Sequence, residues 1–417
     1  MAEGRSGPAV SVASVLLLAL AVMTAMYALV LAGLVRGLRA LKRVTQHLPD
    51  VWPSVSVIVP ARNEADVLER TLYSLLDQDY PGTWEIVVVD DRSTDNTAAI
   101  LRELESRHPR LRHVTVEQPN PPSPKKHALA VGIGRSVGEI IVTTDADCTY
   151  EIGWLRGMIS HMASDIGVVA GLTVFDLPSN HVPAWQKIQW FDFLVQQLVA
   201  AGAAGVGVPS SCNGSNLAYR RVAFDEISGF GESAAVVSGD DVLFAQRVSK
   251  QSTWRVTFAC APETVVRSLP VATVREMFDQ RMRWASKGLA YRPSMLAFLF
   301  GIYAYYLLWI ASAAAVILQP GLLPILLGLG AWKLTVDYAT VRVGCTTFGQ
   351  TKLLRYFVPF ILLHTLFTPV FGLFGLLVPY RWKGEWYRTP VLPRSVRRGL
   401  ARVRRAYRQR RVAQKAA

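Results

Sequence analysis

Long apolar segments at both ends of the chain constrain its fold more than any other feature. Residues 11–35 carry no charge, and residues 295–318, 322–343 and 356–378 are nearly as apolar. Roughly 20 apolar residues are enough for a helix to cross a bilayer, and the first segment is too long for the apolar part of a signal peptide. The pattern predicts an N-terminal transmembrane helix at 11–35, a globular domain at 52–292, and C-terminal membrane segments within 295–378.

Basic residues predict the side of the membrane on which the globular domain lies. Arg36, Arg39, Lys42 and Arg43 directly follow the first apolar segment. The positive-inside rule therefore predicts a multi-pass protein of the plasma (inner) membrane with a cytoplasmic globular domain. Three further crossings would place the basic C-terminus outside, against the same rule. Because prolines interrupt residues 356–378, that segment is either a true span or a re-entrant or interfacial segment.

The C-terminal residues 381–417 hold most of the excess charge of the chain. They carry thirteen Lys or Arg and one acidic residue, and so supply twelve of the fourteen net positive charges. Basic residues beside apolar spans favour anionic lipid head groups. The tail lacks the interleaved aromatic residues of single-strand nucleic-acid binders, so we expect no nucleic-acid partner. We expect a basic tail that is either solvated or bound to membrane lipids.

Two internal features of the apolar regions allow specific expectations. Lys333 and Asp337 lie four residues apart within an apolar segment, so we expect them to pair with each other or to face the bundle interior. Residues 184–208 are amphipathic with helical spacing. They form either an ordinary buried helix or a helix on the membrane surface.

The middle of the chain alternates strand and helix patterns, which predicts an α/β domain with a mostly parallel sheet. Expected strands and helices are, in chain order, 55–59, 64–76, 85–89, 93–107, 113–116, 125–135 and 139–144, with the first strand ending at Pro60 and the second helix capped by Ser93 or Thr94. The four cysteines have no spacing typical of zinc sites or disulfides, which favours a reducing compartment.

A pair of carboxylates follows the last of these strands. Residues i and i+2 share a face of a strand, so Asp145 and Asp147 can point into the same volume at the carboxyl end of the sheet. Open α/β sheets bind ligands at that edge. Two hard oxygen ligands there suit Mg²⁺ or Mn²⁺ that keeps waters and also binds a diphosphate.

Taken together, the motifs resemble those of family 2 glycosyltransferases with the Rossmann-like GT-A fold. They are most similar to the membrane-embedded branch that includes cellulose, hyaluronan and poly-N-acetylglucosamine synthases and ceramide glucosyltransferase. The resemblance covers roughly residues 54–288. It implies a hexosyltransferase-type enzyme that takes a nucleotide-sugar donor, expected to be a UDP-sugar.

The resemblance assigns donor-binding roles by motif. Pro60-Ala61-Arg62-Asn63-Glu64 resembles P-x-x-N-E, and Val89-Asp90-Asp91-Arg92-Ser93-Thr94-Asp95 resembles V-D-D-G-S-x-D, with Arg92 in place of the usual glycine. Lys125 begins a K-x-x-A-L helix start. Asp145-Ala146-Asp147 matches D-x-D, in which the second carboxylate is the more direct metal ligand. The residues expected to contact the donor are Pro60, Asn63, Glu64, Asp90, Asp91, Lys125, Asp145, Gln280, Arg283 and Trp284, with Asp145 and Asp147 on the metal.

The remaining motifs imply an acceptor site and a base. Residues 211–216 resemble the acceptor-pocket segment, and Gly239-Asp240-Asp241 stands where T-E-D is usual, which makes Asp241 the expected general base. Gln280-Arg281-Met282-Arg283-Trp284 matches Q-[QR]-x-R-W, and its outer residues share one helix face by spacing. The residues expected to contact the acceptor are Cys212, Gly214, Ser215, Asp240 and Trp284.

The implied reaction is a single displacement with inversion. Metal and Arg283 would stabilise the leaving diphosphate while Asp241 takes the acceptor proton. The acceptor is either a lipid hydroxyl or a growing polysaccharide, with a slight preference for the lipid. Two alternatives remain: a membrane-anchored nucleotidyltransferase, and a non-catalytic nucleotide-sugar-binding protein.

Overall fold

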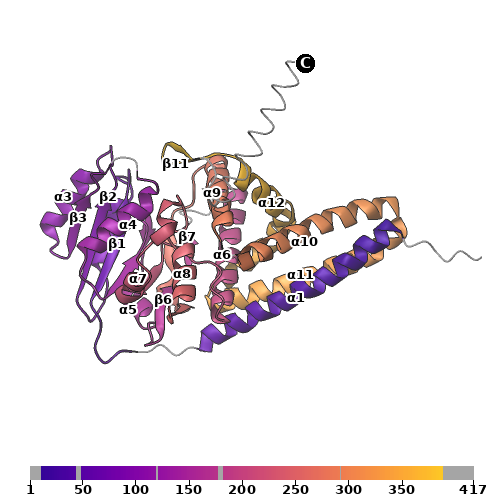
Figure 1. The fold of residues 1–417 in the computed structure, drawn as a ribbon, viewed down its shortest axis with the longest axis horizontal. Coiled ribbons are helices and arrows are strands. Elements are labelled where there is room, and N and C mark those ends of the chain that lie inside the picture. The colour runs from indigo at the N-terminus through magenta and orange to yellow at the C-terminus, as the bar shows by residue number, and fades with distance from the viewer. Residues whose placement is uncertain (1–10, 44–47, 119–120, 177–181, 292, 388–417) are drawn as a thin grey trace, which may run out of the picture.

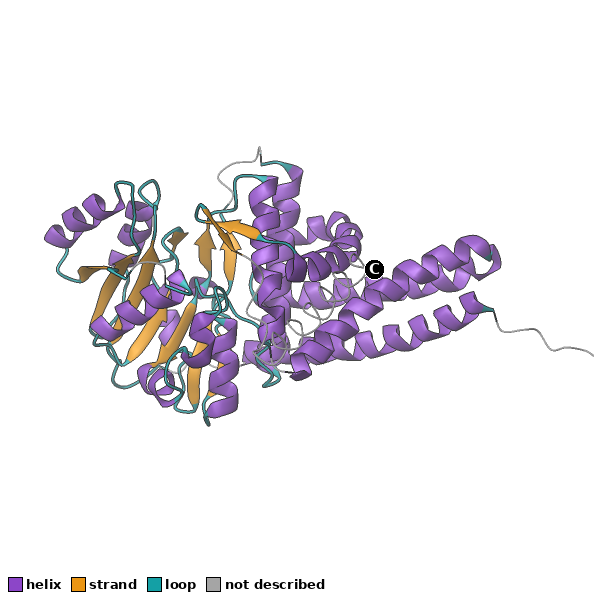
Figure 2. Ribbon diagram, turned by 45° about the horizontal axis from the view of Figure 1, so that its top comes forward, coloured by secondary structure: helices purple, strands orange, loops and turns teal. Residues whose placement is uncertain are grey.

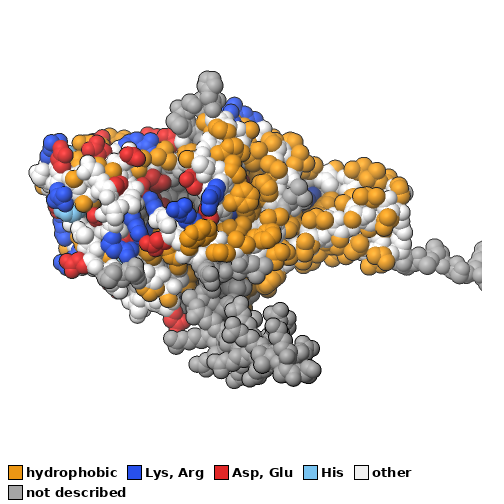
Figure 3. Space-filling model, turned by 90° about the horizontal axis from the view of Figure 1, so that it is seen from above, with side chains coloured by type: hydrophobic (Ala, Val, Ile, Leu, Met, Phe, Trp, Pro, Cys, Tyr) orange, Lys and Arg blue, Asp and Glu red, His pale blue; other side chains and the backbone are white. Residues whose placement is uncertain are grey.

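The molecule is elongated, with an α/β part at one end and long apolar helices at the other (Figure 1). The computed structural model describes residues 11–43, 48–118, 121–176, 182–291 and 293–387. Figure 2 shows all longer strands gathered in the α/β part, and the face in Figure 3 carries its charged side chains there and hydrophobic side chains over the long helices. The surface on this face is therefore charged over the α/β part and apolar over the long helices.

Four parallel strands and three helices build the first half of the α/β part. In chain order they are β1 (Val55–Ala61), α2 (Leu68–Leu76), β2 (Trp84–Asp90), α3 (Thr97–Arg107), β3 (Leu111–Thr115), α4 (Pro124–Arg135) and β4 (Ile140–Thr143). The strand order β3-β2-β1-β4 places β1 between β2 and β4, and all three pairs are parallel. One face of the sheet packs on α2 and α3 and the other on α4. Coverage of both faces explains why the strands are almost continuously apolar.

The second half completes a seven-stranded sheet with one reversed strand. It contains β5 (Cys148–Thr149), α5 (Trp154–Ile159), β6 (Ile166–Ala170), β7 (Thr173–Phe175), β8 (Leu217–Arg220), α7 (Arg221–Glu226), α8 (Val242–Gln251), β9 (Arg255–Phe258) and β10 (Val266–Ser268). β8 runs antiparallel to its neighbours β4 and β6, and β6 pairs with β9 in parallel. The small sheet β5-β10-β7 lies beside it. The expected α/β fold with a mostly parallel sheet is confirmed.

Local boundaries differ from the sequence expectation in three places. β1 continues through Pro60 to Ala61, and α2 begins at Leu68 instead of residue 64. Helix α3 begins at Thr97, so the expected cap by Ser93 or Thr94 is wrong. Both residues bind Asn63 instead: the backbone N–H of Asn63 donates to Ser93 Oγ (3.0 Å), and the backbone N–H of Thr94 donates to Asn63 Oδ1 (2.8 Å). A tertiary hydrogen bond has replaced the local cap.

Helix α6 (Ala184–Gly205) lies between the sheet and the long apolar helices (Figure 1). Phe191, Leu194 and Leu198 are buried in the same core cluster as the residues of β6 and α4. On its other sides α6 contacts α1 (Val12–Arg43), α11 (Leu323–Thr347) and α12 (Phe357–Leu377). The helix is therefore buried between the two parts of the molecule.

The long apolar helices α1, α10 (Pro293–Leu318) and α11 run side by side away from the sheet (Figure 1). Within the described residues these three are long and apolar enough to cross a membrane, and a fourth candidate, residues 351–375, is bent by 52°. Lys333 and Asp337 of α11 form the expected ion pair (Nζ to Oδ2, 2.6 Å), and Tyr27 donates a hydrogen bond to Asp337 Oδ1 (2.7 Å). The two opposite charges inside the apolar bundle therefore neutralise each other.

Glycines allow α1 and α6 to cross in backbone contact. A Cβ added at Gly37 would lie 1.9 Å from the carbonyl oxygen of Gly202, and one added at Gly205 would lie 2.3 Å from the carbonyl oxygen of Gly37. Small residues at a helix crossing permit this close approach. The crossing fixes α1 directly against the helix that supports the sheet.

We expect Gly37→Leu to separate α1 from α6 and to lower the free energy of unfolding by on the order of 3 kcal/mol, because a side chain cannot fit against backbone. Gly33→Leu on the same helix is the matched control, since a Cβ there meets no atom within 4 Å. Thermal unfolding of both variants in detergent measures the difference. Equal midpoints would mean that the crossing can widen without cost.

The described chain ends in a β-hairpin and not in the basic tail expected from residue 381. Strands β11 (Tyr380–Trp382) and β12 (Glu385–Tyr387) pair antiparallel around a turn in which Lys383 and Gly384 have positive φ. Such two-residue turns match the twist of a hairpin. The rest of the expected tail, residues 388–417, lies outside the described residues.

Candidate active site

Three loops meet at the carboxyl edge of the sheet because β1 lies between β2 and β4. Pro60, Asn63 and Glu64 are at the end of β1, Asp90 and Asp91 end or follow β2, and Asp145 and Asp147 follow β4. Parallel strands end on the same side, so these side chains share one edge of the sheet. Seven of the residues expected to contact the donor or the metal are therefore brought together, whereas Gln280, Arg283 and Trp284 lie on a separate helix.

The loop after β2 keeps the shape that a glycine would give it. Arg92 replaces the usual glycine but adopts φ +59°, the left-handed conformation. Its Nε donates to Asp91 Oδ1 at 2.8 Å, and the backbone N–H of Ser93 donates to Asp90 Oδ1 at 3.0 Å. A non-glycine residue in this conformation costs free energy, which the ion pair to Asp91 offsets in part.

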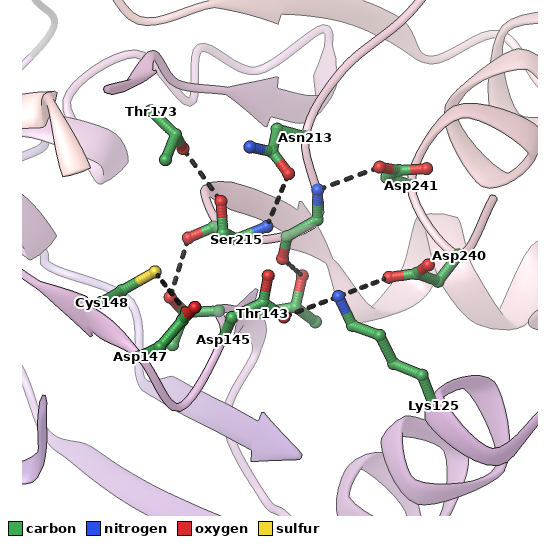
Figure 4. Close-up of polar contacts among 12 residues, drawn as sticks. Lys125, Thr143, Asp145, Asp147, Cys148, Thr173, Asn213, Ser215, Asp240 and Asp241 are labelled. Atoms are coloured by element: carbon green, nitrogen blue, oxygen red, sulfur yellow. Dashed lines mark hydrogen bonds and ion pairs between the residues drawn. The ribbon is translucent and has the colours of Figure 1, made fainter. Parts of the chain in front are cut away.

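Lys125 links the two halves of the site (Figure 4). From the first turn of α4, its Nζ lies 2.6 Å from Asp145 Oδ1 and 3.1 Å from Asp240 Oδ2. Burial alone would lower the pKa of Lys125, but the charges of Asp145 and Asp240 raise it above its usual value. The lysine is therefore charged, and it joins the expected donor edge to the expected acceptor edge.

Asp147 is enclosed more than a surface carboxylate. Burial, and then the charges of Asp145 and Glu64, raises its pKa to about 6, and Cys148 Sγ donates a hydrogen bond to its Oδ1 at 3.5 Å. No group of three or more His, Cys, Asp or Glu side chains arranged for a metal occurs among the described residues. A pair of carboxylates with few other protein ligands fits Mg²⁺ or Mn²⁺, which take one or two carboxylates together with waters and substrate phosphates.

Asp241 begins α8 and is held by three contacts. Its Oδ1 accepts from the backbone N–H of Val242 (2.6 Å), its Oδ2 accepts from the backbone N–H of Gly214 (3.1 Å), and Lys287 Nζ lies 3.6 Å from Oδ1. A Cβ on Gly214 would lie 2.6 Å from Asp240 Oδ2, so a side chain at this position would displace the carboxylate that pairs with Lys125. The two acids and Gly214 therefore pack against one another.

The expected acceptor residues do not all face the same space. Cys212 lines a cavity beside Asp241, and burial raises the pKa of its thiol well above the usual value. Ser215 instead faces the interior, where its Oγ hydrogen-bonds Thr173 Oγ1 at 2.9 Å. Asp240 forms an ion pair with Lys125. The structure therefore brings Cys212 and Trp284 to the cavity and leaves Ser215 as a support for the loop.

Helix α9 (Val274–Ser286) directs the outer residues of Q-[QR]-x-R-W toward two neighbours, α6 and the C-terminal hairpin. Trp284 stacks on Phe193 of α6, with ring centroids 5.5 Å apart. The guanidinium of Arg283 lies over the ring of Trp382 at 5.3 Å, and Gln189 Nε2 donates to Gln280 Oε1 at 3.2 Å. The motif joins α6, the cavity and the C-terminal hairpin.

Sequence reasoning missed the hairpin as part of the donor edge. Lys383 Nζ lies 2.5 Å from Glu64 Oε1 and donates to the carbonyl oxygen of Arg62 at 3.2 Å, while Arg62 Nη2 lies 2.8 Å from Glu385 Oε1. Burial raises the pKa of Glu64, and Lys383 offsets part of that effect. A Lys-Gly turn between aromatic residues was the available signal for the hairpin, but nothing local indicated its position.

Lys126, next to Lys125, was also missed. Its Nζ donates to the carbonyl oxygens of Ser233, Val236 and Ser238, at 2.7, 2.9 and 3.1 Å. These carbonyls belong to the segment that leads into Asp240 and Asp241. Adjacent lysines therefore have different surroundings, one among carboxylates and one among backbone carbonyls.

A cavity of about 790 Å³ opens beside Asp241. Its mostly apolar wall comes from α6, α9, α10 and α12, and at one end it reaches Asn213, Asp241 and Lys287. A space of this volume with a few polar groups is typical of small-molecule sites.

A parallel-rich sheet whose carboxyl edge gathers these acids and Lys125 has the arrangement expected of the GT-A fold. The chain belongs to glycosyl transferase family 21, whose family model matches residues 15–391. The resemblance drawn from the motifs is thereby confirmed.

Relatives and a solved structure agree with this class. The chain is 28% identical over 269 residues to the beta-monoglucosyldiacylglycerol synthase of Synechocystis, covering 61% of this chain and 53% of that protein. It is 28% identical over 256 residues to an N-acetylglucosaminyltransferase of Rhizobium meliloti, covering 59% and 57%. The chain spans about half the length of the curated relatives it matches.

The fold is also similar to that of a mannosyltransferase from Pyrobaculum calidifontis solved with GDP-mannose and Mn²⁺. The TM-score is 0.51 at 20% identity, with 87% of this chain and 95% of that chain covered. At this identity the likeness concerns the fold alone.

Proposed function

We propose that this protein is a membrane-bound, inverting glycosyltransferase that moves a sugar from a UDP-sugar to the hydroxyl group of a lipid. The observation that carries the lipid acceptor is the apolar cavity, which extends from the long helices α10 and α12 to Asp241. A lipid chain in this cavity would bring its hydroxyl to that carboxylate. The relative named as a glucosyldiacylglycerol synthase supports the same acceptor class.

In this mechanism one group of residues stabilises the leaving diphosphate, and Asp241 acts as the base on the opposite side of the sugar. Asp145 and Asp147 would hold a divalent cation, Mg²⁺ or Mn²⁺, which would supply positive charge for the departing diphosphate. Lys125, Arg283 and Lys383 surround the same region with positive charge. On the other side Asp241 accepts the hydroxyl proton, and Lys287, whose Nζ lies 3.6 Å from Asp241 Oδ1, helps to orient that carboxylate. Attack from the side opposite the leaving group inverts the anomeric centre.

The proposed topology has three crossings, formed by α1, α10 and α11. The hairpin at 380–387 contacts Glu64 and Arg62 of the α/β part, so both must lie on the same side of the membrane. An even number of crossings after the α/β part is then required, and the bent segment that includes α12 is re-entrant or interfacial. This arrangement fits the 11–35 span, the 52–292 glycosyltransferase domain, the interface helix at 184–208 and a basic C-terminus on the cytoplasmic side.

The test is product analysis with the purified full chain in vesicles that contain diacylglycerol. Labelled UDP- and GDP-sugars are supplied in turn with Mn²⁺, and the products are separated by solvent extraction and thin-layer chromatography. We expect label from one UDP-sugar to enter an organic-soluble glycolipid. Label in an aqueous product that stays at the origin would indicate a polysaccharide acceptor. UDP binding without consumption of any donor would indicate a non-catalytic protein.

For Lys383 we expect Lys383→Ala to raise the donor KM about tenfold, because a charged hydrogen bond contributes roughly 1.5–3 kcal/mol and Glu64 would then face the diphosphate without a partner. Arg381→Ala is the matched control on the same hairpin. Its contact to Asp279 is made through the backbone N–H, which alanine retains. Steady-state kinetics with varied donor measures the effect, and an unchanged KM in Lys383→Ala would remove this lysine from the donor site.

A further inference from the structure

Four polar side chains interrupt the apolar wall of the cavity and have no part in the mechanism above. Gln189 and Asp192 come from α6, Arg281 from α9 and His364 from α12, and all four line the cavity. We call them the polar cluster. The other wall residues of these helices near them include Phe193, Phe360 and Phe367. Gln196 and Thr368, which also line the cavity, hydrogen-bond Asp192 and His364, so the polar cluster is part of a connected polar patch in a mostly apolar wall.

The charged members of the polar cluster are paired. Arg281 Nη2 forms an ion pair with Asp192 Oδ2, and His364 Nδ1 lies 3.7 Å from Asp192 Oδ1. Burial would raise the pKa of Asp192, but Arg281 and His364 more than offset it and lower the pKa. The Arg281 guanidinium also lies 4.7 Å from the ring centre of Trp284. A buried ion pair of this kind is seldom more stabilising than apolar residues of the same volume, so stability alone does not explain it.

Two atoms of the polar cluster are left without partners. Arg281 and Gln189 are only 8% and 2% exposed. Arg281 Nη1 and Gln189 Oε1 are buried and have no hydrogen-bond partner among the residues that the structure describes. Burying such an atom without a hydrogen bond is costly, because the atom has given up its hydrogen bonds to water. One atom is a donor and the other an acceptor, and both belong to residues that line the cavity.

The polar cluster stands close to the catalytic end of the cavity. Arg281 and Lys287 are six residues apart along α9 and its continuation, which is roughly 9 Å along a helix. Lys287 contacts Asp241. A lipid whose hydroxyl lies at Asp241 would thus place the groups next to that hydroxyl near Arg281, and its chains in the apolar remainder of the cavity.

We propose that the polar cluster binds the acyl linkage of the lipid acceptor, with Arg281 donating a hydrogen bond to the acyl carbonyl oxygen. This inference rests on the proposed function. The carbonyl belongs either to an ester, as in a diacylglycerol, or to an amide, as in an N-acyl amino alcohol. An ester satisfies Arg281 Nη1 alone. An amide satisfies both free atoms, because its N–H can donate to Gln189 Oε1.

The test compares acceptors that differ only in the linkage. The purified full chain is assayed with a diacylglycerol and its dialkyl ether analogue, and with an N-acyl amino alcohol and its O-alkyl analogue. Loss of the carbonyl should raise the acceptor KM at least tenfold in the unaltered protein. In Arg281→Met the KM should be the same for the diacylglycerol and its ether analogue, which differ in the carbonyl alone, whereas Arg275→Met, an exposed arginine of the same helix, should keep the difference.

Two further variants separate the linkages and guard against misfolding. Gln189→Leu should weaken the N-acyl lipid and leave the diacyl lipid unchanged. Arg281→Lys keeps a charge for Asp192 and should retain part of the carbonyl preference. Because each KM ratio is taken within one variant, a lower folded fraction does not alter it.

The outcomes distinguish the two proposals. Equal KM values for carbonyl and ether lipids in the unaltered protein, or an unchanged ratio in Arg281→Met, would overturn the acyl-linkage site while leaving a lipid acceptor in place. Absence of glycolipid from every acceptor would overturn the proposed function itself.

Discussion

Replacing Asp241 by asparagine should reduce kcat by about 10²–10⁴-fold, the usual contribution of a general base. Asparagine cannot accept the acceptor hydroxyl proton, but it retains the size of the side chain. It is also a good N-cap, so it can keep the contact to the backbone N–H of Val242 that starts α8. The loss should therefore concern chemistry and not folding.

The measurement is single-turnover transfer in vesicles, together with UDP affinity and thermal unfolding. UDP affinity and the unfolding midpoint should stay close to those of the unaltered protein. Asp225→Asn, which changes an exposed acid of α7, is the matched control and should be fully active. Turnover of Asp241→Asn within a factor of two of the unaltered protein would exclude this carboxylate as the base.

Replacing Lys125 by methionine should have the largest combined effect on stability and activity. The variant leaves Asp145 and Asp240 without their shared cation, in a region that also holds Asp147 and Asp241. Removing one partner of a buried pair costs about 3–5 kcal/mol, and we expect the lower end because Asp145 is 35% exposed. Donor affinity should fall as well, because four carboxylates would then repel the diphosphate.

Chemical unfolding and UDP titration with and without Mn²⁺ measure the two effects. Lys250→Met, at an exposed lysine in the last turn of α8, controls for the loss of one positive charge. If Mn²⁺ restores the stability of Lys125→Met, the cation has taken over the role of the lysine between the acids. Unaltered stability and UDP affinity without Mn²⁺ would show that Lys125 is not needed to hold the acids together.

The sheet and its carboxyl edge could be predicted because their signals are local. Buried parallel strands are continuously apolar, and the acids follow them directly, so the positions of Asp90, Asp91, Asp145 and Asp147 come from short stretches of sequence. The pairing of Lys333 with Asp337 was predictable for the same reason. Helix spacing decides which side chains meet.

The missed features depend on contacts between distant residues. Ser93 was expected to cap a helix, but its Oγ instead accepts a hydrogen bond from the backbone N–H of Asn63, which lies in another loop. Arg281 occupies a variable position of its motif, and only the packing of α6 and α12 around it reveals its free N–H. Hydropathy alone does not give the number of crossings. The proposed number rests instead on the contact of Lys383 with Glu64.

That contact has a consequence for biosynthesis. Lys383, which we propose to contact the donor, is translated more than 300 residues after Glu64, and the hydrophobic helices that the structure describes lie between or before these two residues in the chain. A ribosome-bound precursor would lack this contact until the last helix and the hairpin have been synthesised and folded. If Lys383 contacts the donor as proposed, a half-inserted chain, or an excised fragment that ends before the hairpin, should bind the sugar nucleotide more weakly than the full chain.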